Sequence, residues 1–461
     1  MMDEMAKALQ EKMKGYQSEM LHHFKQLLKI NTVRGERLDG APFGKGNREA
    51  LAYMLDLSKH FGLRTVNLDH YIGYSEYGNG QDYICSIAHL DVVPPGDGWT
   101  FPPFDAAEKD GILYARGAGD DKPGCIVGLY ALRCMKELGY QPKRKIRVIY
   151  GCAEETGMED ADYYLQSQPL PVFGFTPDSD GYDIVNAEKG RIEICLESER
   201  GKNSPVILAD GGLVPNMVPA IATAVLNRTA MTPPELARLE ALTAHSPDCQ
   251  REDRGSETVL TFQGISAHAA MPEGGRNAIA AYARFVSEVL EERTDVLTSF
   301  IHTQIDFDWS GTKLGLACSD SDMGDLTLNV GVLRMEEDRI RATVDIRYPT
   351  SVNAQTIQSR LEEALAGKGI SLRVLSAADG HRCVCPEKFS VLREVCLDLG
   401  KPEPQCKSIS GGTYAKKFKG RLVAFGGCGG SVHAPDEFVP IADFYDHADV
   451  VCYALYRLSR G

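Results

Sequence analysis

The strand-like runs in the first third of the chain constrain its fold more than any other feature of the sequence. Three such runs lie at 82–88, 145–151 and 172–176, and a helical pattern fits between the first two at 124–138. Strands separated by helical segments favour a mainly parallel sheet flanked by helices on both faces. The sequence therefore predicts an α/β domain for this part of the chain.

The middle of the chain, from about residue 188 to 383, shows a different pattern. Polar and apolar residues alternate in four segments, as they do in strands of a sheet with one solvated face: RIEICLE, ETVLTFQG, LTLNVGVL and RIRATVDIRYP. Helical patterns accompany them at 275–292 and 353–366, and residues 230–255 suggest a helix followed by a loop. We expect a separate α+β domain in this region.

The pattern of the first third returns after residue 383. A helix is expected near 388–399, a strand at 421–425 and a last helix near 440–459. We therefore predict a discontinuous α/β domain of residues 1–187 and 384–461, into which an α+β domain of residues 188–383 is inserted.

The charge balance argues against two classes of partner. The chain has 50 Lys and Arg against 64 Asp and Glu residues, a formal net charge of −14, whereas nucleic acids and anionic membranes attract clustered basic residues. No apolar run approaches the roughly 20 residues that span a bilayer, and the N-terminal residues lack the pattern of a signal peptide. With 13 cysteines but no CxxC pair, we expect reduced thiols in a cytoplasmic protein that binds neither nucleic acid nor membrane.

Acidic and histidine side chains follow each of the three strand-like runs. His89 and Asp91 follow the first, Glu154 and Glu155 the second, and Asp178 the third. In open α/β sheets, ligands bind beyond the carboxyl ends of the strands. We therefore expect these residues to gather at one edge of the sheet.

Two further segments carry the same kinds of side chain. Asp120 and Asp121 lie in GAGDDKPG, and His433 lies in GGSVHAPDE. Neighbouring carboxylates repel one another unless a positive charge compensates them. Two histidines and three carboxylates are typical of a dinuclear hydrolase site, and this mixed set favours Zn, Mn or Co over Mg or Ca. Asp91 could then accept the second N–H of the His89 imidazole, and Glu154 could take a proton from water.

Six motifs stand out along roughly residues 80–440: SIAHLDVVPPGDGW, YARGAGDDKPG, EETG, TPD, GISAHAAMPEGGRNA and VHAPDE. In sequence and in order they resemble the motifs of the M20 metallopeptidase family. The segments HLDVVPPGDGW, NMVP, DIRYP and SGGTYA most resemble the PepV-type, Sapep-like dipeptidases of that family. The resemblance implies that the α/β domain is a di-zinc exopeptidase-like catalytic domain and that the inserted α+β domain is its lid.

The resemblance also implies the roles of the metal ligands. His89 and Asp178 would bind one divalent metal ion, Glu155 and His433 would bind a second, and Asp120 would bridge the two. Zinc is the metal that this implies first, with Mn and Co as alternatives.

The same resemblance assigns the residues around the metals. Glu154 would be the general base, Asp91 would orient a ligand histidine, and the peptide bond from the bridging aspartate to Asp121 would be cis. The chain departs from the family at DDKPG, where relatives read DDKG. Because proline suits the first turn of a helix, we expect Pro123 to have little effect on metal binding.

The lid would supply most of the groups that contact the substrate. His268 would stabilise the oxyanion, Arg347 would bind the C-terminal carboxylate of the substrate with two hydrogen bonds, and Asn216 would donate near its carbonyl. In the last part of the chain, Gly412 and its two neighbours could offer main-chain N–H groups to the same carboxylate.

Together these expectations predict an enzyme that hydrolyses dipeptides with water activated by two metal ions. Hydrolysis of N-acyl amino acids, of the acetylornithine or succinyl-diaminopimelate type, is the alternative within the family, and a non-catalytic metal- or ligand-binding protein is the alternative from another class. The inserted domain, of about 195 residues, resembles the extra segment that stands in for a partner subunit in PepV-like relatives. We therefore expect a monomer that acts on a small peptide.

Overall fold

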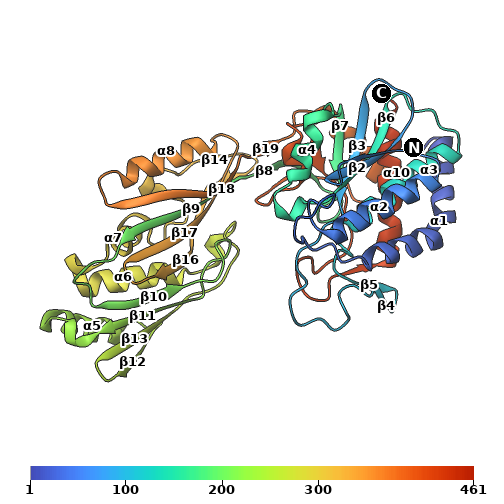
Figure 1. The fold of residues 1–461 in the computed structure, drawn as a ribbon. Coiled ribbons are helices and arrows are strands. Elements are labelled where there is room, and N and C mark those ends of the chain that lie inside the picture. The colour runs from blue at the N-terminus through green and yellow to red at the C-terminus, as the bar shows by residue number, and fades with distance from the viewer. Residues whose placement is uncertain (1) are drawn as a thin grey trace. The chain divides into compact units, whose positions relative to one another are not determined.

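Residues 2–461 are described in a computed structural model, in which the chain forms two compact units (Figure 1). Unit 1 consists of the chain up to Ala187, His381–Ser408 and Gly412–Gly461, and unit 2 consists of Glu188–Gly380 and Ile409–Gly411. The division falls at Gly380 rather than at the expected residue 383, because the strand β19 (His381–Arg382) joins the sheet of unit 1.

The sheet of unit 1 has nine strands. Eight follow one another across the sheet in the order β1 (Arg64–Leu68), β2 (Ile72–Tyr77), β6 (Lys145–Gly151), β3 (Tyr83–His89), β7 (Phe173–Thr176), β21 (Leu422–Ala424), β8 (Ile184–Glu188) and β19, and β20 (Cys406–Ile409) pairs with β8. The central strands β6, β3, β7 and β21 are parallel. The expected parallel sheet is thus confirmed at the centre of the unit, while β2 and β8 pair antiparallel on either side of it.

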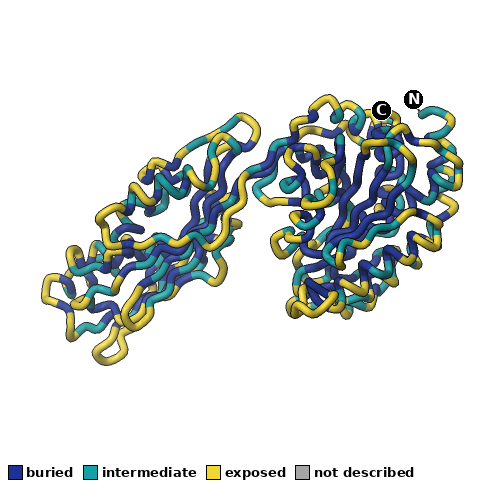
Figure 2. Tube along the Cα trace, turned by 45° about the horizontal axis from the view of Figure 1, so that its top comes forward, coloured by how far each residue is buried: buried dark blue, intermediate teal, exposed yellow. Residues whose placement is uncertain are grey.

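Helices cover both faces of this sheet. Strands alternate their side chains between faces: Ile84, Ile146 and Val148 belong to one hydrophobic cluster, and Tyr83, Cys85 and Ile149 belong to another. The first cluster packs against α1 (Glu4–Leu28), α2 (Lys45–His60), α3 (Lys122–Glu137), α9 (Phe389–Asp398) and α10 (Ile441–Ser459). The second packs against α4 (Glu159–Ser167) and the short helix η8 (Tyr414–Lys417). The tube in Figure 2 shows the buried strands between these layers.

A small sheet joins two loops of unit 1 that matter for the site. It consists of β4 (Ala107–Lys109), β5 (Ile112–Tyr114) and β22 (Phe438–Pro440), and β22 pairs with β5. The residues after β5 and those before β22 therefore lie side by side.

Unit 2 is built on one antiparallel sheet of eight strands. Their order is β12 (Cys249–Arg254), β13 (Glu257–Gln263), β11 (Ile221–Asn227), β10 (Val206–Gly211), β16 (Thr327–Met335), β17 (Arg339–Tyr348), β9 (Gly190–Glu199) and β18 (Ile370–Ala378). Burial alternates along these strands, with Thr258, Leu260 and Phe262 of β13 buried and their neighbours more exposed. The expected sheet with one solvated face is confirmed.

The helices of unit 2 pack against the buried face of this sheet in one hydrophobic cluster. They are α5 (Pro233–His245), α6 (Ala278–Leu290), α7 (Val296–Phe300) and α8 (Ala354–Leu365). Residues 230–255 differ from the expected helix and loop, because the supposed loop forms the edge strand β12. Its sequence CQREDR is strongly charged, as is common for an edge strand that must not pair further.

The remaining elements are short. They are the hairpin β14 (Ser319–Asp320) and β15 (Gly324–Asp325), and the single-turn helices η1 (Glu154–Thr156), η2 (Arg228–Ala230), η3 (Pro272–Gly274), η4 (Glu291–Arg293), η5 (Ile301–Ile305), η6 (Thr312–Leu314) and η7 (Pro386–Lys388). Within residues 2–461, no helix combines the length and the apolar character needed to cross a membrane.

Candidate active site

The predicted metal ligands of unit 1 come from loops at the carboxyl ends of the parallel strands. His89 is the last residue of β3, and it lies opposite Gly151, the last residue of β6. Glu154 and Glu155 open the short helix η1 just beyond β6, and Asp178 lies two residues beyond β7. Because parallel strands end at the same edge of a sheet, these side chains converge there.

The two oxygens of Asp120 face two different histidines. His89 Nε2 lies 2.7 Å from Asp120 Oδ1, and His433 Nε2 lies 3.0 Å from Asp120 Oδ2. His433 Nε2 is also 2.9 Å from Glu155 Oε1. A carboxylate that presents one oxygen to each of two ligand sets has the arrangement required of a bridging ligand.

Two groups of ligand atoms are compact enough to hold metal ions. His89, Glu154 and Asp178 form one group and His89, Asp120 and Glu155 form the other, and within each group the ligand atoms lie within 4.8 Å of one another. In residues 2–461, Glu154 Oε1 is a buried oxygen without a hydrogen-bond partner. Burial and the nearby charge of Asp178 raise the pKa of Glu154 well above its usual value. An acidic cluster with such an unpartnered oxygen fits divalent cations, and its histidine and carboxylate donors suit Zn, Mn or Co.

The charges of the histidines respond to the same carboxylates. Although burial alone would lower it, the charge of Asp120 raises the pKa of His89 well above the usual value. Hydrogen bonds to Asp120 and Glu155 raise the pKa of His433 to about 10. The carboxylates thus favour positive charge around both imidazoles, which is the condition under which a divalent cation would bind there.

The orientation of His89 differs in one detail from the expectation. Its Nδ1 lies 2.8 Å from the main-chain oxygen of Asp91, which can only accept, so Nδ1 carries a proton. Nε2, which faces Asp120 Oδ1, is the nitrogen that could bind a metal. The Asp91 carboxylate is 3.7 Å from Nδ1. It instead accepts the main-chain N–H groups of Glu154 and Glu155, each at 3.1 Å. The main chain of Asp91 orients His89, while its side chain binds the turn that carries both glutamates.

The segment after Asp120 matches two expectations. The peptide bond between Asp120 and Asp121 is cis. Helix α3 begins at Lys122, so Pro123 lies in its first turn. Lys122 is fully buried, and its Nζ donates to the main-chain oxygen of Ile30 at 3.0 Å. Burial lowers the pKa of Lys122 to about 7.

Glu437 is a functional candidate that the sequence analysis missed. Its Oε2 accepts a hydrogen bond from Arg116 at 2.6 Å, and both residues are about 1% exposed. Its Oε1 accepts the main-chain N–H groups of Gly117, Gly119 and Asp120 at 2.8–3.1 Å. Glu437 thus links the loop of Asp120 to the loop of His433. The acidic end of the VHAPDE motif was the available signal.

Two of the predicted substrate-binding residues of unit 2 adjoin each other. Met217 and His268 form an antiparallel bridge, and the N–H of Ala269 donates to the main-chain oxygen of Asn216 at 2.9 Å. His268 Nδ1 accepts the N–H of Ala270 at 3.2 Å, so the proton of a neutral His268 lies on Nε2. Desolvation and the charge of Arg347 lower the pKa of His268, which favours that neutral form.

Two amide side chains support this pair of segments. Asn329 is 2% exposed, and its Nδ2 donates to the main-chain oxygens of Pro215 at 3.1 Å and Met217 at 2.8 Å, on either side of Asn216. Asn277 Nδ2 in turn donates to Asn329 Oδ1 at 3.0 Å. Neither amide was expected to matter, because Asn329 supports Asn216 only through main-chain oxygens and Asn277 acts through Asn329.

Arg347 is more enclosed than its predicted role suggests. It is 6% exposed, its Nε donates to Asp345 Oδ1 at 2.7 Å, and its Nη1 donates to the main-chain oxygen of Ser410. Arg191 lies directly opposite it on β9 and donates to Asp345 Oδ2 at 2.6 Å. Gly412 is exposed and lies just after the segment Ile409–Gly411 that belongs to unit 2.

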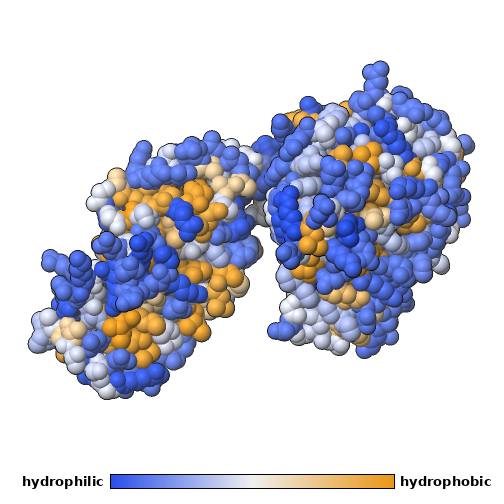
Figure 3. All heavy atoms as spheres, viewed as in Figure 1, coloured by the Kyte–Doolittle hydropathy of each residue, from blue (hydrophilic) through white to orange (hydrophobic). Residues whose placement is uncertain are grey.

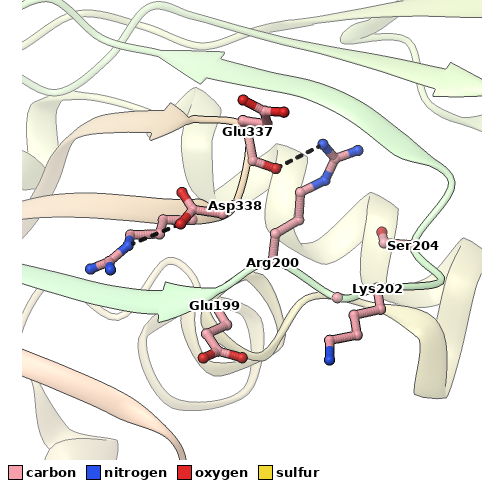
Figure 4. A pocket seen from close by; sticks show the side chains of 8 residues that line it. Glu199, Arg200, Lys202, Ser204, Glu337 and Asp338 are labelled. Atoms are coloured by element: carbon pink, nitrogen blue, oxygen red, sulfur yellow. Dashed lines mark hydrogen bonds and ion pairs between the residues drawn. The ribbon is translucent and has the colours of Figure 1, made fainter.

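Other surfaces of unit 2 carry none of the predicted site residues. A polar pocket of about 560 Å³ lies at the end of β9 and the turn between β16 and β17. Figure 4 shows acidic and basic side chains mixed around it, and Arg200 Nη1 donates to the main-chain oxygen of Glu337 at 3.5 Å.

Hydrophobic residues are also exposed on unit 2 (Figure 3). Among them are Met217, at 44%, and Met271, at 61%, which flank the Asn216 and His268 segments.

Comparison with known proteins relates this geometry to a family. Residues 85–457 match the sequence profile of Peptidase family M20/M25/M40. A Bacillus subtilis (strain 168) protein, provisionally named dipeptidase YtjP, is 32% identical over 457 residues, which cover 96% of this chain and 97% of that protein. Beta-Ala-Xaa dipeptidase of Lactobacillus delbrueckii subsp. lactis is 29% identical over 461 residues and 96% of each chain. The crystal structure of human carnosine dipeptidase 1 aligns with this chain over 100% of both chains, with a TM-score of 0.60 and 13% sequence identity. This likeness shows a shared fold.

Proposed function

Because the chain belongs to Peptidase family M20/M25/M40, we propose that it is a metal-dependent dipeptidase. The observation that carries the proposal is the pair of three-residue groups that share His89, one of which includes the buried, unpartnered oxygen of Glu154. Relatives with dipeptidase names that cover almost the whole chain support dipeptides as substrates.

We propose two divalent ions, with zinc favoured and Mn or Co as alternatives. His89 and Asp178 would bind one ion, Glu155 and His433 the other, and Asp120 both. The separate contacts of the two Asp120 oxygens support this assignment. Bound metal ions would lower the pKa of water and polarise the scissile carbonyl.

The chain itself would move the protons. Glu154 would accept the proton of the attacking water at its free Oε1 and return it to the departing amine nitrogen. His268 would donate its Nε2–H to the carbonyl oxygen as negative charge develops there. The support for this role is the hydrogen bond from Ala270, which leaves the proton on Nε2.

Recognition of the substrate ends would distinguish a dipeptidase from its alternatives. Arg347, Asn216 and Gly412 would bind the C-terminal carboxylate and the carbonyl. We further propose that the protein is a monomer. We also propose a reducing, cytoplasmic compartment, which the thirteen free cysteines support. Hydrolysis of N-acyl amino acids and non-catalytic binding remain the rival functions.

The test is amide hydrolysis by metal-stripped protein reloaded separately with Zn, Mn and Co. The panel consists of Ala-Ala, Leu-Leu, β-Ala-His, a tripeptide, N-acetylornithine and N-succinyl-diaminopimelate. We expect metal-dependent cleavage of dipeptides, with kcat about 10²–10⁴-fold lower in Glu154→Gln. The variant should retain its metal, which controls for loss of the site. Cleavage restricted to the N-acyl compounds would overturn the dipeptidase proposal in favour of a deacylase, and no cleavage with metal bound would favour a binding protein.

A further inference from the structure

The turn that carries the two site glutamates has an unusual set of hydrogen-bond acceptors. Four consecutive main-chain N–H groups, from Cys152 to Glu155, are all accepted by buried carboxylates. Asp160 Oδ2 accepts those of Cys152 at 2.6 Å and Ala153 at 3.1 Å. Asp91 accepts the next two. The conformation of the turn therefore depends on two acids that lie beneath it, each at most 1% exposed.

Asp160 is itself fixed from a distant part of the chain. Tyr414 Oη donates to Asp160 Oδ2 at 2.5 Å, and both residues are fully buried. A Cβ on Gly151 would lie 1.9 Å from that Oη, so the phenol reaches Asp160 only because residue 151 is glycine. The Asp160 oxygen thus accepts one phenol O–H and two main-chain N–H groups of the turn.

We propose that Asp160 and Tyr414 are positioning residues, which act on Glu154 through the main chain of Cys152 and Ala153. This inference rests on the proposed function, in which Glu154 moves the proton. Hydrogen bonds to an ionised acceptor are short and directional, so the phenol keeps the Asp160 oxygen under the turn. Without the phenol, the carboxylate and the turn are free to shift. A displacement of about 1 Å at a catalytic group can lower a rate about 100-fold.

The consequence for catalysis is a specific kinetic pattern. The hydrogen bond of Tyr414 fixes the base rather than the groups proposed to bind the substrate. Its loss should therefore lower kcat and leave KM unchanged. The main chain of Asp91 orients the proposed ligand His89, and Glu437 binds the N–H of Asp120. The proposed ligand Glu155 lies on the turn, but its own N–H is bound by Asp91 rather than by Asp160, so the metal affinity should also be unchanged.

The test compares Tyr414→Phe with Tyr164→Phe. Tyr164 is equally buried and belongs to the same hydrophobic cluster, but its hydroxyl contacts Tyr83 and Arg147 instead of the turn. We expect Tyr414→Phe to lower kcat on Ala-Ala about 10–100-fold, with KM and the zinc affinity measured by calorimetry within twofold of wild type. Tyr164→Phe should keep kcat within twofold, whatever its effect on thermal stability. Asp160→Asn should lower kcat further than Tyr414→Phe.

Three outcomes would overturn the inference. One is a kcat within twofold of wild type in Tyr414→Phe. Another is an equal loss in Tyr164→Phe, which would indicate general destabilisation. The third is a rise in KM at constant kcat, which would assign Tyr414 to the neighbouring Gly412 segment. Hydrolysis by the wild-type protein distinguishes these results from failure of the proposed function, since an inactive wild type would overturn that function and this inference together.

Discussion

Substitution of Glu437 by glutamine should destabilise unit 1 by about 3–5 kcal/mol, the usual cost of removing one partner from a buried ion pair. Glutamine has nearly the same shape, and its oxygen could still accept from Gly117, Gly119 and Asp120. Its amide group would then face Arg116 Nη1, which now lies 2.6 Å from Glu437 Oε2. Two donors would meet, and the guanidinium of Arg116, which is 1% exposed, would have no counter-charge there.

Tryptophan fluorescence can follow this loss in unit 1. The chain has two tryptophans, and the ring of Trp99 lies 5.2 Å from the guanidinium of Arg116. In a Trp309→Phe background, urea unfolding of metal-stripped protein therefore reports on the neighbourhood of Glu437. A loss of this size corresponds to a fall in Tm of about 6–20 °C, at about 2–4 °C per kcal/mol for domains of 150–250 residues.

A matched control separates the buried pair from ion pairs in general. Glu394 pairs with Arg457, but its side chain is 57% exposed, so Glu394→Gln should cost less than about 1 kcal/mol. Adding Arg116→Met to Glu437→Gln should recover part of the loss, because the unpaired guanidinium is then removed. A cost below about 1 kcal/mol for Glu437→Gln would refute the reasoning.

Three further predictions concern metal content, pH and substrate binding. His433→Ala should reduce the metal content of zinc-loaded protein from about two ions per chain to about one, as measured by atomic absorption; retention of both ions would exclude His433 as a ligand. Burial lowers the pKa of His447 to about 4, against about 6.5 in the unfolded chain. The unfolded state therefore takes up this proton first, and about 3 kcal/mol of stability should be lost as the pH falls from 6.5 to 4. Urea unfolding of the metal-free protein should show this slope, and His447→Leu should flatten it; an unchanged slope would contradict the assignment. Asn329→Ala should raise KM for Ala-Ala about 10-fold with the metal content unchanged, because two main-chain oxygens beside Asn216 lose their buried donor. An unchanged KM in steady-state assays would show that Asn329 has no influence on the Asn216 segment.

The strand ends of unit 1 were predictable because hydrophobic periodicity is local. The runs at 82–88 and 145–151 became β3 and β6, and the side chains of His89, Glu154 and Asp178 follow from where strands stop. The family motifs were equally visible, and the family assignment is confirmed by the profile match over 85–457. The antiparallel strands β1 and β2 were not expected, since their pairing partners are set by the whole sheet.

The supporting contacts of the site were not predictable from the sequence. Tyr414 bonds to Asp160 across 254 residues of chain, and no local pattern indicates which buried acid will accept which main-chain N–H. For the same reason the sequence analysis assigned the Asp91 carboxylate to His89, although the structure uses it for the turn of Glu154 and Glu155. The residue types indicated a metal-dependent hydrolase site, whereas tertiary packing determined which carboxylate accepts which main-chain N–H group.

The discontinuity of unit 1 sets an order for the assembly of the protein during synthesis. All of unit 2 except Ile409–Gly411 lies in one stretch, Glu188–Gly380, so most of that unit can fold as soon as this stretch has left the ribosome. The sheet of unit 1 must wait for β21, and the candidate metal centre must wait for His433 and Glu437. The first 187 residues therefore remain exposed, with an incomplete sheet and an incomplete set of candidate ligands, while residues 188–433 are made. Nascent chains that stop before residue 433 lack part of the candidate metal centre. Folding of unit 1 and metal binding should therefore both occur late in synthesis and depend on each other.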